Sequence, residues 1–240
     1  MRRHDQHTGV NAVENGRKKR YERNEVSISP AENDILSSKS VCVLGCGGLG
    51  GYIAEMLLRV GVLKLTLIDN DVFDETNLNR QLFSTEAGVG KPKVYEAEKR
   101  LTAVDCGARL NVIHTRLDDE NANELLKGHD AVVDALDNIA SRHIAVKACD
   151  ALEIPFVHGA IGGWYAQVSV IMPKGSGLKP IYGNTTDSDV DNSLGNMSFV
   201  AGFAASLQCA ETIKLLLGKS PNLQGFTARV DLMSYELNIF

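Results

Sequence analysis

The sequence predicts an α/β fold, a Rossmann-like, doubly wound and mostly parallel sheet that antiparallel C-terminal strands extend. Three observations carry this prediction. Short apolar strands alternate with amphipathic stretches over residues 41–152, and a glycine-rich turn over residues 45–50 joins the first pair. From residue 154 onward, strand-like segments follow one another with only glycines or turns between them. Alternation produces parallel strands with right-handed crossovers, whereas strands joined by short turns pair antiparallel.

The length of the chain permits one large α/β domain, and no internal repeat is visible. We expect a polar N-terminal arm at residues 1–20 and a single domain over residues 21–240. The 25 Lys and Arg residues are outnumbered by 30 Asp and Glu, which gives a formal net charge of −5. A nucleic-acid partner is therefore not expected. The one basic cluster, residues 17–20, suits a solvated tail or a first helical turn.

The apolar stretches and the cysteines indicate where in the cell the protein is expected and whether it should contact a membrane. We expect no apolar stretch long enough to cross a bilayer and hence no membrane partner. The first residues lack the apolar core of a signal peptide. The five cysteines show no CxxC spacing: Cys42, Cys46, Cys106, Cys149 and Cys209. This argues against a disulfide framework and a four-thiolate zinc site. We expect a cytoplasmic protein without structural zinc.

A helix begins the predicted domain. Ser29 can cap it, Pro30 suits its first position and Glu32 can complete a capping box, so the helix should run to about Ser38. The alternating elements that follow are strands at 41–45, 63–69, 109–115 and 131–136, and helices at 51–61, 91–104, 120–128 and 138–152.

The last third of the chain has a different pattern. Residues 154–173 hold two strands that should pair antiparallel. Residues 174–196 form a polar loop without periodicity, long enough to be a functional segment. Residues 198–218 predict a nearly all-apolar helix, buried on most faces. Residues 225–232 and 234–240 supply two closing strands.

The glycine turn matches the G-x-G-x-x-G fingerprint, between a strand and a helix. Gly45 permits the tight turn, Gly47 lets a phosphate approach the backbone, and Gly50 allows close packing of helix on strand. Amides at the helix N-terminus then face the anion. Asp69 ends the next strand, where a carboxylate commonly bonds ribose hydroxyls. These residues predict a nucleotide site and leave NAD and ATP both open.

Three further segments, at 69–81, 90–93 and 134–138, favour ATP because parallel strands end around one crevice. Arg80 and Lys93 would bring two more cations than a dinucleotide needs, as a triphosphate would require. Asp137 would lie where a carboxylate can carry Mg²⁺. Each residue has an ordinary alternative, as a surface arginine, a first-turn lysine or a helix cap. Their joint placement around one pocket favours the triphosphate.

Over roughly residues 20–240 the chain resembles the E1-like adenylyltransferases of the MoeB/ThiF/HesA group. The matching segments are RYER (20–23), GCGGLG (45–50), the acid at 69, NLNRQ (77–81), GKPK (90–93), LDN (136–138) and SLQCAETIKLLLG (206–218). The resemblance implies that the C-terminal glycine carboxylate of a ubiquitin-like sulfur carrier, ending in Gly-Gly, attacks the α-phosphorus of ATP. Acyl-adenylate and pyrophosphate result. It also implies a homodimer.

The resemblance further assigns roles to residues. It implies four catalytic residues, Arg23, Arg80, Lys93 and Asp137, with Arg23 reaching across a twofold dimer into the partner's site and Asp137 binding Mg²⁺. The implied nucleotide-binding set is Gly45, Gly47, Gly48, Gly50, Asp69, Asp71, Asn77, Arg80, Gln81, Lys93 and Asp137. In-line displacement at phosphorus needs positioning and charge neutralisation, and a carboxylate is already ionised at neutral pH.

The chain departs from the family in its cysteines. Many members carry two CxxC pairs for zinc, one of them in the segment matching 174–196, and some use a cysteine near there for sulfur or thioester transfer. Here 174–196 contains no cysteine. Cys209 and Cys46 suit packing roles. We expect adenylation without a built-in thiol step, with sulfur delivered by another protein.

Several alternatives stay open. The glycines in 156–170 suit either a Gly-Gly tail lying on the backbone or tight packing, and Trp164 and Tyr165 suit either the tail or the core. A related enzyme could activate a free peptide or a tRNA threonylcarbamoyladenosine carboxylate. An NAD-binding oxidoreductase would lack a visible catalytic pair and leave Lys93 and Asp137 without a role. A non-catalytic subunit would have no need of the four catalytic residues.

Overall fold

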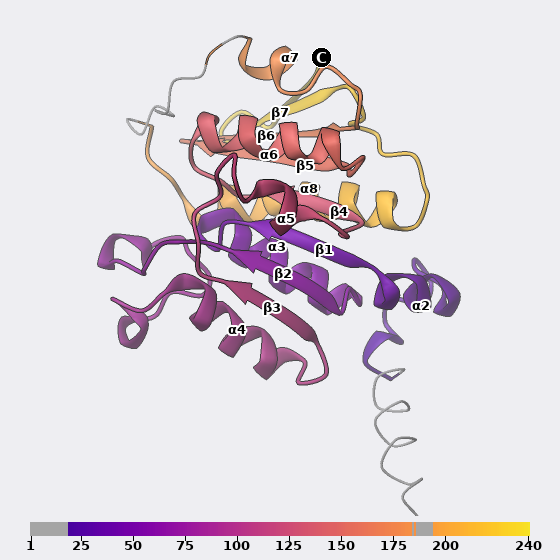
Figure 1. Ribbon diagram of the computed structural model, residues 1–240, viewed down its shortest axis with the longest axis vertical. Coiled ribbons are helices and arrows are strands. Elements are labelled where there is room, and N and C mark those ends of the chain that lie inside the picture. Colours follow the sequence, from indigo (N-terminus) through magenta and orange to yellow (C-terminus); the bar gives the residue numbers. More distant parts are fainter. Residues whose placement is uncertain (1–18, 184, 186–193) are drawn as a thin grey trace, which may run out of the picture.

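The computed structural model describes residues 19–183, 185 and 194–240. Within them, one sheet has the strand order β3-β2-β1-β4-β5-β6-β7-β8 (Figure 1). The parallel strands are β1 (Ser40–Leu44), β2 (Lys64–Ile68), β3 (Arg109–Ile113), β4 (Ala131–Asp134) and β5 (Phe156–Gly162). The antiparallel strands are β6 (Tyr165–Ile171), β7 (Thr227–Asp231) and β8 (Glu236–Ile239). The predicted mixed sheet is confirmed.

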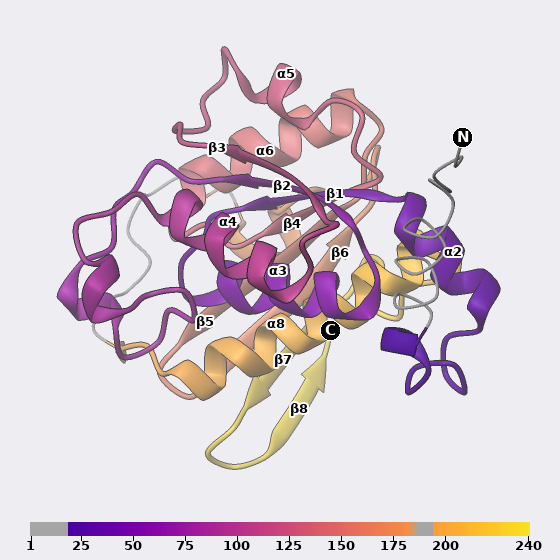
Figure 2. The same cartoon turned by 90° about the horizontal axis from the view of Figure 1, so that it is seen from below.

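Helices cover both faces of this sheet, as Figure 2 shows. On one face lie α3 (Gly48–Val60), α4 (Lys93–Val104) and α8 (Ser198–Leu216), and on the other α5 (Ala122–Leu126) and α6 (Ile139–Ala151). Alternation along β1 produces the two cores: Val41 and Val43 face α3 and α8, whereas Cys42 and Leu44 face α5 and α6. A period of two is what a strand buried on both faces requires.

The helix before β1, α2 (Pro30–Ser38), begins as the sequence predicts. The Ser29 hydroxyl accepts from the Glu32 amide at 3.3 Å, and the Glu32 carboxylate accepts from the Ser29 amide at 2.8 Å. This capping box satisfies two amides that the first turn leaves without partners. The predicted arm at 1–20 lies almost wholly outside the described residues, so its boundary stays a prediction.

Two expectations need correction. The helix expected from residue 51 begins at Gly48, so the last residues of the glycine turn form its first turn. The segment expected to be a loop throughout contains a single helical turn, α7 (Lys179–Tyr182). Pro180 suits the start of that turn, and the Tyr182 side chain enters the protein, as described below. Part of this segment, residues 184 and 186–193, lies outside the described residues.

The expectation that no stretch could span a membrane was wrong as a statement about length and composition. α8 is 19 residues long and apolar enough to pass that test, alone among the helices in the described part of the chain. The helix packs against α3, β5 and β6, and half of its most apolar window is buried inside the protein. A core helix buried on several faces has this composition for the same reason as a membrane span.

Candidate functional site

The carboxyl ends of the parallel strands surround a cavity of about 380 Å³. Its walls come from the glycine turn after β1, the end of β2, the segment after β4, and residues Ala160 and Ile161 of β5. Asn196 lies on one side, where its backbone carbonyl accepts from the side-chain amide of Asn79 at 3.2 Å. Parallel strands place ligands at this edge.

The four glycines of the turn do different work. Gly45 has a φ of +97°, and a Cβ there would lie 2.5 Å from the Ala135 carbonyl oxygen. A Cβ at Gly50 would lie 1.8 Å from the Gly45 carbonyl oxygen, so this glycine serves helix packing and does not line the cavity. Gly47 and Gly48 do line it, and side chains there would meet neighbours only at ordinary contact distances. Their backbone borders the cavity with no side chain to cover it, as the approach of a phosphate requires.

Asp69 fixes the turn to the end of β2. Its Oδ2 accepts from the Cys46 amide at 2.7 Å and its Oδ1 from the Asp71 amide at 2.8 Å. Burial raises the pKa of Asp69, although these amides and the Lys93 charge favour the carboxylate. Asp69 lines the cavity, and each of its oxygens can accept a second hydrogen bond, as binding of ribose hydroxyls would require.

Two cations of the predicted set border the cavity, as does Gln81. The Lys93 ammonium lies 2.9 Å from the Asp71 carboxylate, with the lysine side chain 8% exposed. The Arg80 guanidinium donates to the Thr76 carbonyl at 3.0 Å. The buried Oε1 of Gln81 has no hydrogen-bond partner among the described residues. A buried polar atom without a partner is costly, so this amide marks a place where a ligand would bind.

Asp137 is exposed at the cavity wall, in the segment after β4. The helix-cap alternative applies to its neighbour: Asn138 accepts from the Ser141 amide at 2.8 Å and donates to Asp137 at 3.0 Å. Asp137 thus presents a carboxylate to the cavity. Within the described residues no group of three or more His, Cys, Asp or Glu side chains could hold a metal. One carboxylate still fits Mg²⁺, which usually takes one or two from the protein and the rest from phosphates and water.

The structure keeps two further expected residues away from the cavity. Asn77, expected to hold phosphates, is buried and accepts from the Asp74 amide at 3.1 Å, where it closes the 3₁₀ turn Glu75–Asn77. Its partner is therefore the backbone. Arg23 is exposed and does not line the cavity of its own chain. Its expected role concerns a second copy and stays a prediction.

A cluster of polar side chains that adjoins the cavity was not predicted from the sequence. Asp134, Arg142, His158 and Tyr182 join in one hydrogen-bonded group, and Arg142 also lines the cavity. One signal was available: Arg142 falls on the apolar face of the helix expected at 138–152, where a charge requires a buried partner.

The structure bears on the alternatives left open for residues 156–170. A Cβ at Gly159 would lie 2.2 Å from Gln208, so packing explains that glycine. Trp164 is 37% exposed and packs on Phe199 with ring centroids 5.2 Å apart, and Tyr165 is 42% exposed. Neither aromatic residue closes the core.

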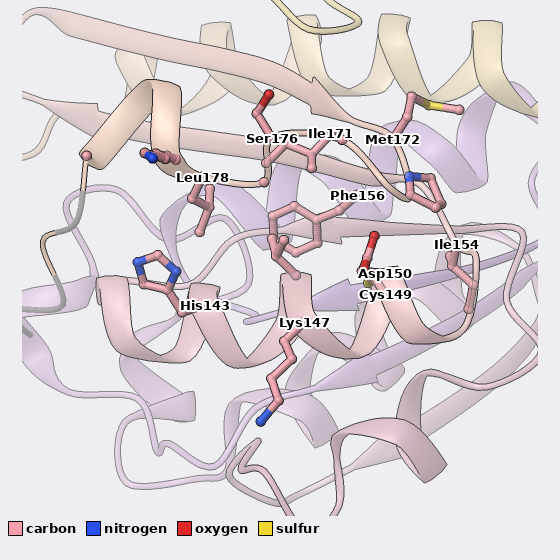
Figure 3. Close-up of a pocket in the computed structure, with 16 residues that line it drawn as sticks. His143, Lys147, Cys149, Asp150, Ile154, Phe156, Ile171, Met172, Ser176 and Leu178 are labelled. Atoms are coloured by element: carbon pink, nitrogen blue, oxygen red, sulfur yellow. The ribbon is translucent and has the colours of Figure 1, made fainter.

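A second cavity of about 470 Å³ lies on the α6 face, away from the glycine turn (Figure 3). It lies between α6 and the segment 172–183, over a floor that includes Ile154 and Phe156. Lys147 at its rim pairs with Asp119 at 2.8 Å. None of the nucleotide-site residues contributes to it.

A family model described as the ThiF family matches residues 21–240. The chain belongs to the ThiF family. Among curated ThiF-family relatives, it is 33% identical over 228 residues to the sulfur carrier protein adenylyltransferase of Thermus thermophilus, covering 89% of this chain and 83% of the relative. It is 32% identical over 206 residues to the molybdopterin-synthase adenylyltransferase of Escherichia coli, covering 84% and 82%. Both names fit the predicted class of E1-like adenylyltransferases.

Other ThiF-family relatives are longer. The chain is 29% identical over 210 residues to a probable molybdopterin-synthase adenylyltransferase of Porphyra purpurea, and spans 55% of it. Among solved structures, E. coli MccB with ATP superposes with a TM-score of 0.81 at 22% identity, over 92% of this chain and 71% of that chain. PaaA gives a TM-score of 0.79 at 20% identity, over 92% and 72%. At these identities the likeness shows the fold.

Proposed function

We propose that the chain uses ATP to adenylate the C-terminal glycine carboxylate of a ubiquitin-like sulfur carrier, releasing pyrophosphate. One observation carries the proposal: Arg80, Lys93 and Asp137 border the same cavity as the glycine turn. The two cations exceed what a dinucleotide requires, and the Asp137 carboxylate borders the same cavity. The names of the relatives support the substrate class.

The reaction makes one bond and breaks one. A carboxylate oxygen of the carrier attacks the α-phosphorus, and the bond from that phosphorus to the pyrophosphate oxygen breaks. Lys93 and Arg80 would neutralise the phosphate charge, which rises on the leaving group. Mg²⁺, held by Asp137 and the phosphates, would add to that neutralisation. Asp69 would orient the ribose, and no side-chain base is needed because the attacking carboxylate is already ionised.

The carrier's tail has a path into this cavity. Ala160 and Ile161 of β5 line it, and Gly162 at the end of the strand carries no side chain, with only Leu194 within 4 Å of where a Cβ would lie. Gly163 is buried, and its amide donates to the Gly195 carbonyl at 2.9 Å, so this residue is not open to a tail. A thin glycine tail could lie along the β5 backbone, where side chains would collide. The backbone of β5 from residue 160 to residue 162 therefore suits a substrate that ends in Gly-Gly.

Pyrophosphate exchange with ATP tests the function. We expect exchange that depends on one member of a panel of purified carriers ending in Gly-Gly. The variant Asp137→Ala should abolish exchange while unfolding at the same denaturant concentration as the wild type, and Asp119→Ala is a matched control on an exposed aspartate. Near-normal exchange in Asp137→Ala, or nicotinamide reduction that needs no ATP, would contradict the proposal.

We also propose a homodimer in which Arg23 completes the partner's site, and a cytoplasmic location. The exposed position of Arg23, outside its own cavity, supports the first, and cysteines without disulfide bonds in the described residues support the second. Arg23→Ala and Lys93→Met should each be inactive alone. After subunit exchange in an equimolar mixture, up to a quarter of the wild-type activity should return, because each mixed dimer has one intact site. Lack of restoration in dimers shown by light scattering to have exchanged would refute the shared site.

A further inference from the structure

Four side chains form a closed ring of hydrogen bonds behind Asp137. Arg142 donates from Nε to the Asp134 carboxylate at 3.0 Å and from Nη1 to the Tyr182 hydroxyl at 3.3 Å. The Tyr182 hydroxyl lies 3.2 Å from Nε2 of His158, and Nδ1 of His158 lies 2.7 Å from Asp134. Asp134 and His158 are fully buried, and Arg142 is 2% exposed.

The protonation states of the four side chains determine which group donates each hydrogen bond in the ring. Burial disfavours a charged Asp134, but Arg142 and the His158 bond together hold its pKa below the ordinary value. Burial lowers the pKa of His158, which is therefore neutral. Burial also raises the pKa of Tyr182 to about 12, so its hydroxyl keeps the proton. Nδ1–H of His158 then donates to Asp134, and the Tyr182 hydroxyl donates to Nε2.

The ring holds the backbone that carries Asp137. The Asp134 carboxylate accepts from the Leu136 amide at 2.9 Å, and the Arg142 guanidinium donates to the Leu136 carbonyl. The Gln208 amide donates to the Asp134 carbonyl at 2.7 Å. Leu136 is thus held through both its amide and its carbonyl, one residue before Asp137. Restraint of this kind fixes where the next side chain points.

Tyr182 brings a distant segment into the ring. Residues 172–183 lie alongside α6 at the second cavity, with His143 of α6 and Leu178 of the segment at its walls (Figure 3). The segment is attached near its start, where the Lys174 amide donates to Asp150 at 2.5 Å, and near its end, where Tyr182 enters the ring. The segment is therefore joined through Tyr182 to the ring that holds the backbone beside Asp137.

We propose that Tyr182 is a positioning residue for Asp137, acting through the Arg142–His158–Asp134 ring and so linking the segment 172–183 to the magnesium side of the nucleotide cavity. The proposal rests on the proposed function, because it takes Asp137 as the carboxylate for Mg²⁺. Tyr182 itself does not line that cavity.

Calorimetric titration of ATP with and without Mg²⁺ tests this link, using Tyr182→Phe. Removing the hydroxyl should lower the Mg²⁺-dependent gain in ATP affinity by about tenfold, the usual effect of losing a residue that orients a metal ligand. Affinity without Mg²⁺ should stay within about twofold. Tyr235→Phe, on a tyrosine that is 87% exposed, is the matched control.

Asp137→Ala serves as the reference. If it loses the Mg²⁺-dependent gain while Tyr182→Phe keeps it, the link is refuted and the proposed function stands. If Tyr182→Phe weakens ATP equally with and without Mg²⁺, its role is merely structural and the link is again refuted. If Asp137→Ala keeps the full gain, the metal assignment fails and the link fails with it.

Hydrogen exchange gives a second readout that does not depend on Mg²⁺. In Tyr182→Phe without nucleotide, amides of residues 134–138 should exchange faster than in the wild type, while those of β1 should not change. Unchanged exchange at 134–138 would overturn the proposal.

Discussion

The ammonium of Lys93 lies 2.9 Å from the carboxylate of Asp71, yet the lysine side chain is 8% exposed and the aspartate side chain 51% exposed. The pair is therefore asymmetric: water solvates the anion, and the protein surrounds the cation. A buried cation at the edge of the cavity attracts phosphate more strongly than a solvated one would.

Replacing Lys93 should affect catalysis far more than stability. In Lys93→Met, we expect the rate of pyrophosphate exchange to fall by about 100-fold or more, because a preorganised cation facing the phosphates is lost. The free energy of unfolding should change by about 1 kcal/mol or less, since Asp71 stays hydrated. Lys91→Met, on a lysine whose side chain is 52% exposed, is the control. Equal exchange rates in the two variants would contradict the assignment.

Substitutions at two glycines of the turn should differ in their effect on stability, because Gly50 is required for packing and Gly48 lines the cavity. A Cβ at Gly50 collides with backbone, so Gly50→Ala should lower the free energy of unfolding by about 3 kcal/mol or prevent folding. Gly48→Ala has open contacts and should change it by about 1 kcal/mol or less. Urea denaturation of both variants measures this. Comparable losses would mean that the turn relaxes around a new Cβ.

Acid should weaken the protein through Asp134. Because its pKa is lowered in the folded state, Asp134 binds fewer protons there than in the unfolded chain. The stabilisation is complete above the ordinary pKa of 3.8 and is lost as the pH falls through the lowered folded value. Asp134→Asn should cost about 3–5 kcal/mol near neutral pH, since it leaves Arg142 buried without its counter-charge.

The check is denaturation of wild type and Asp134→Asn at several pH values. The difference between them should shrink below about pH 4, as the wild-type carboxylate is protonated. Asp119→Asn, on an aspartate whose side chain is 62% exposed, should follow the wild type. A constant difference down to pH 2 would show that the pair does not supply the pH dependence.

The thiols should differ sharply in reactivity. Burial raises the pKa of Cys149 and Cys209 to about 12 and that of Cys42 and Cys46 well above the ordinary value, whereas Cys106 is exposed. At pH 8 in native protein, we expect a thiol reagent to modify Cys106 rapidly and the other four only after denaturation. Mass spectrometry of the labelled peptides identifies the site. Rapid modification of Cys46 or Cys209 would reopen a thiol role for them.

Local signals in the sequence determined the order of strands and helices, the capping box at Ser29 and the nucleotide turn. Each depends on residues a few positions apart: alternation along β1, a cap three residues before its acid, and glycines at fixed spacing. Convergence of Arg80, Lys93 and Asp137 also followed, because parallel strands all end at one edge of the sheet.

Only the tertiary structure decided which side chains face the cavity and which support it. Asn77 has a side chain that could bind phosphate, yet its amide oxygen accepts a hydrogen bond from the backbone amide of Asp74. The ring of Asp134, Arg142, His158 and Tyr182 joins residues up to 48 positions apart, as the sequence numbers show. The periodicity of the sequence does not predict which of these residues pair. The pairing depends on packing, which brings buried polar groups from distant segments together.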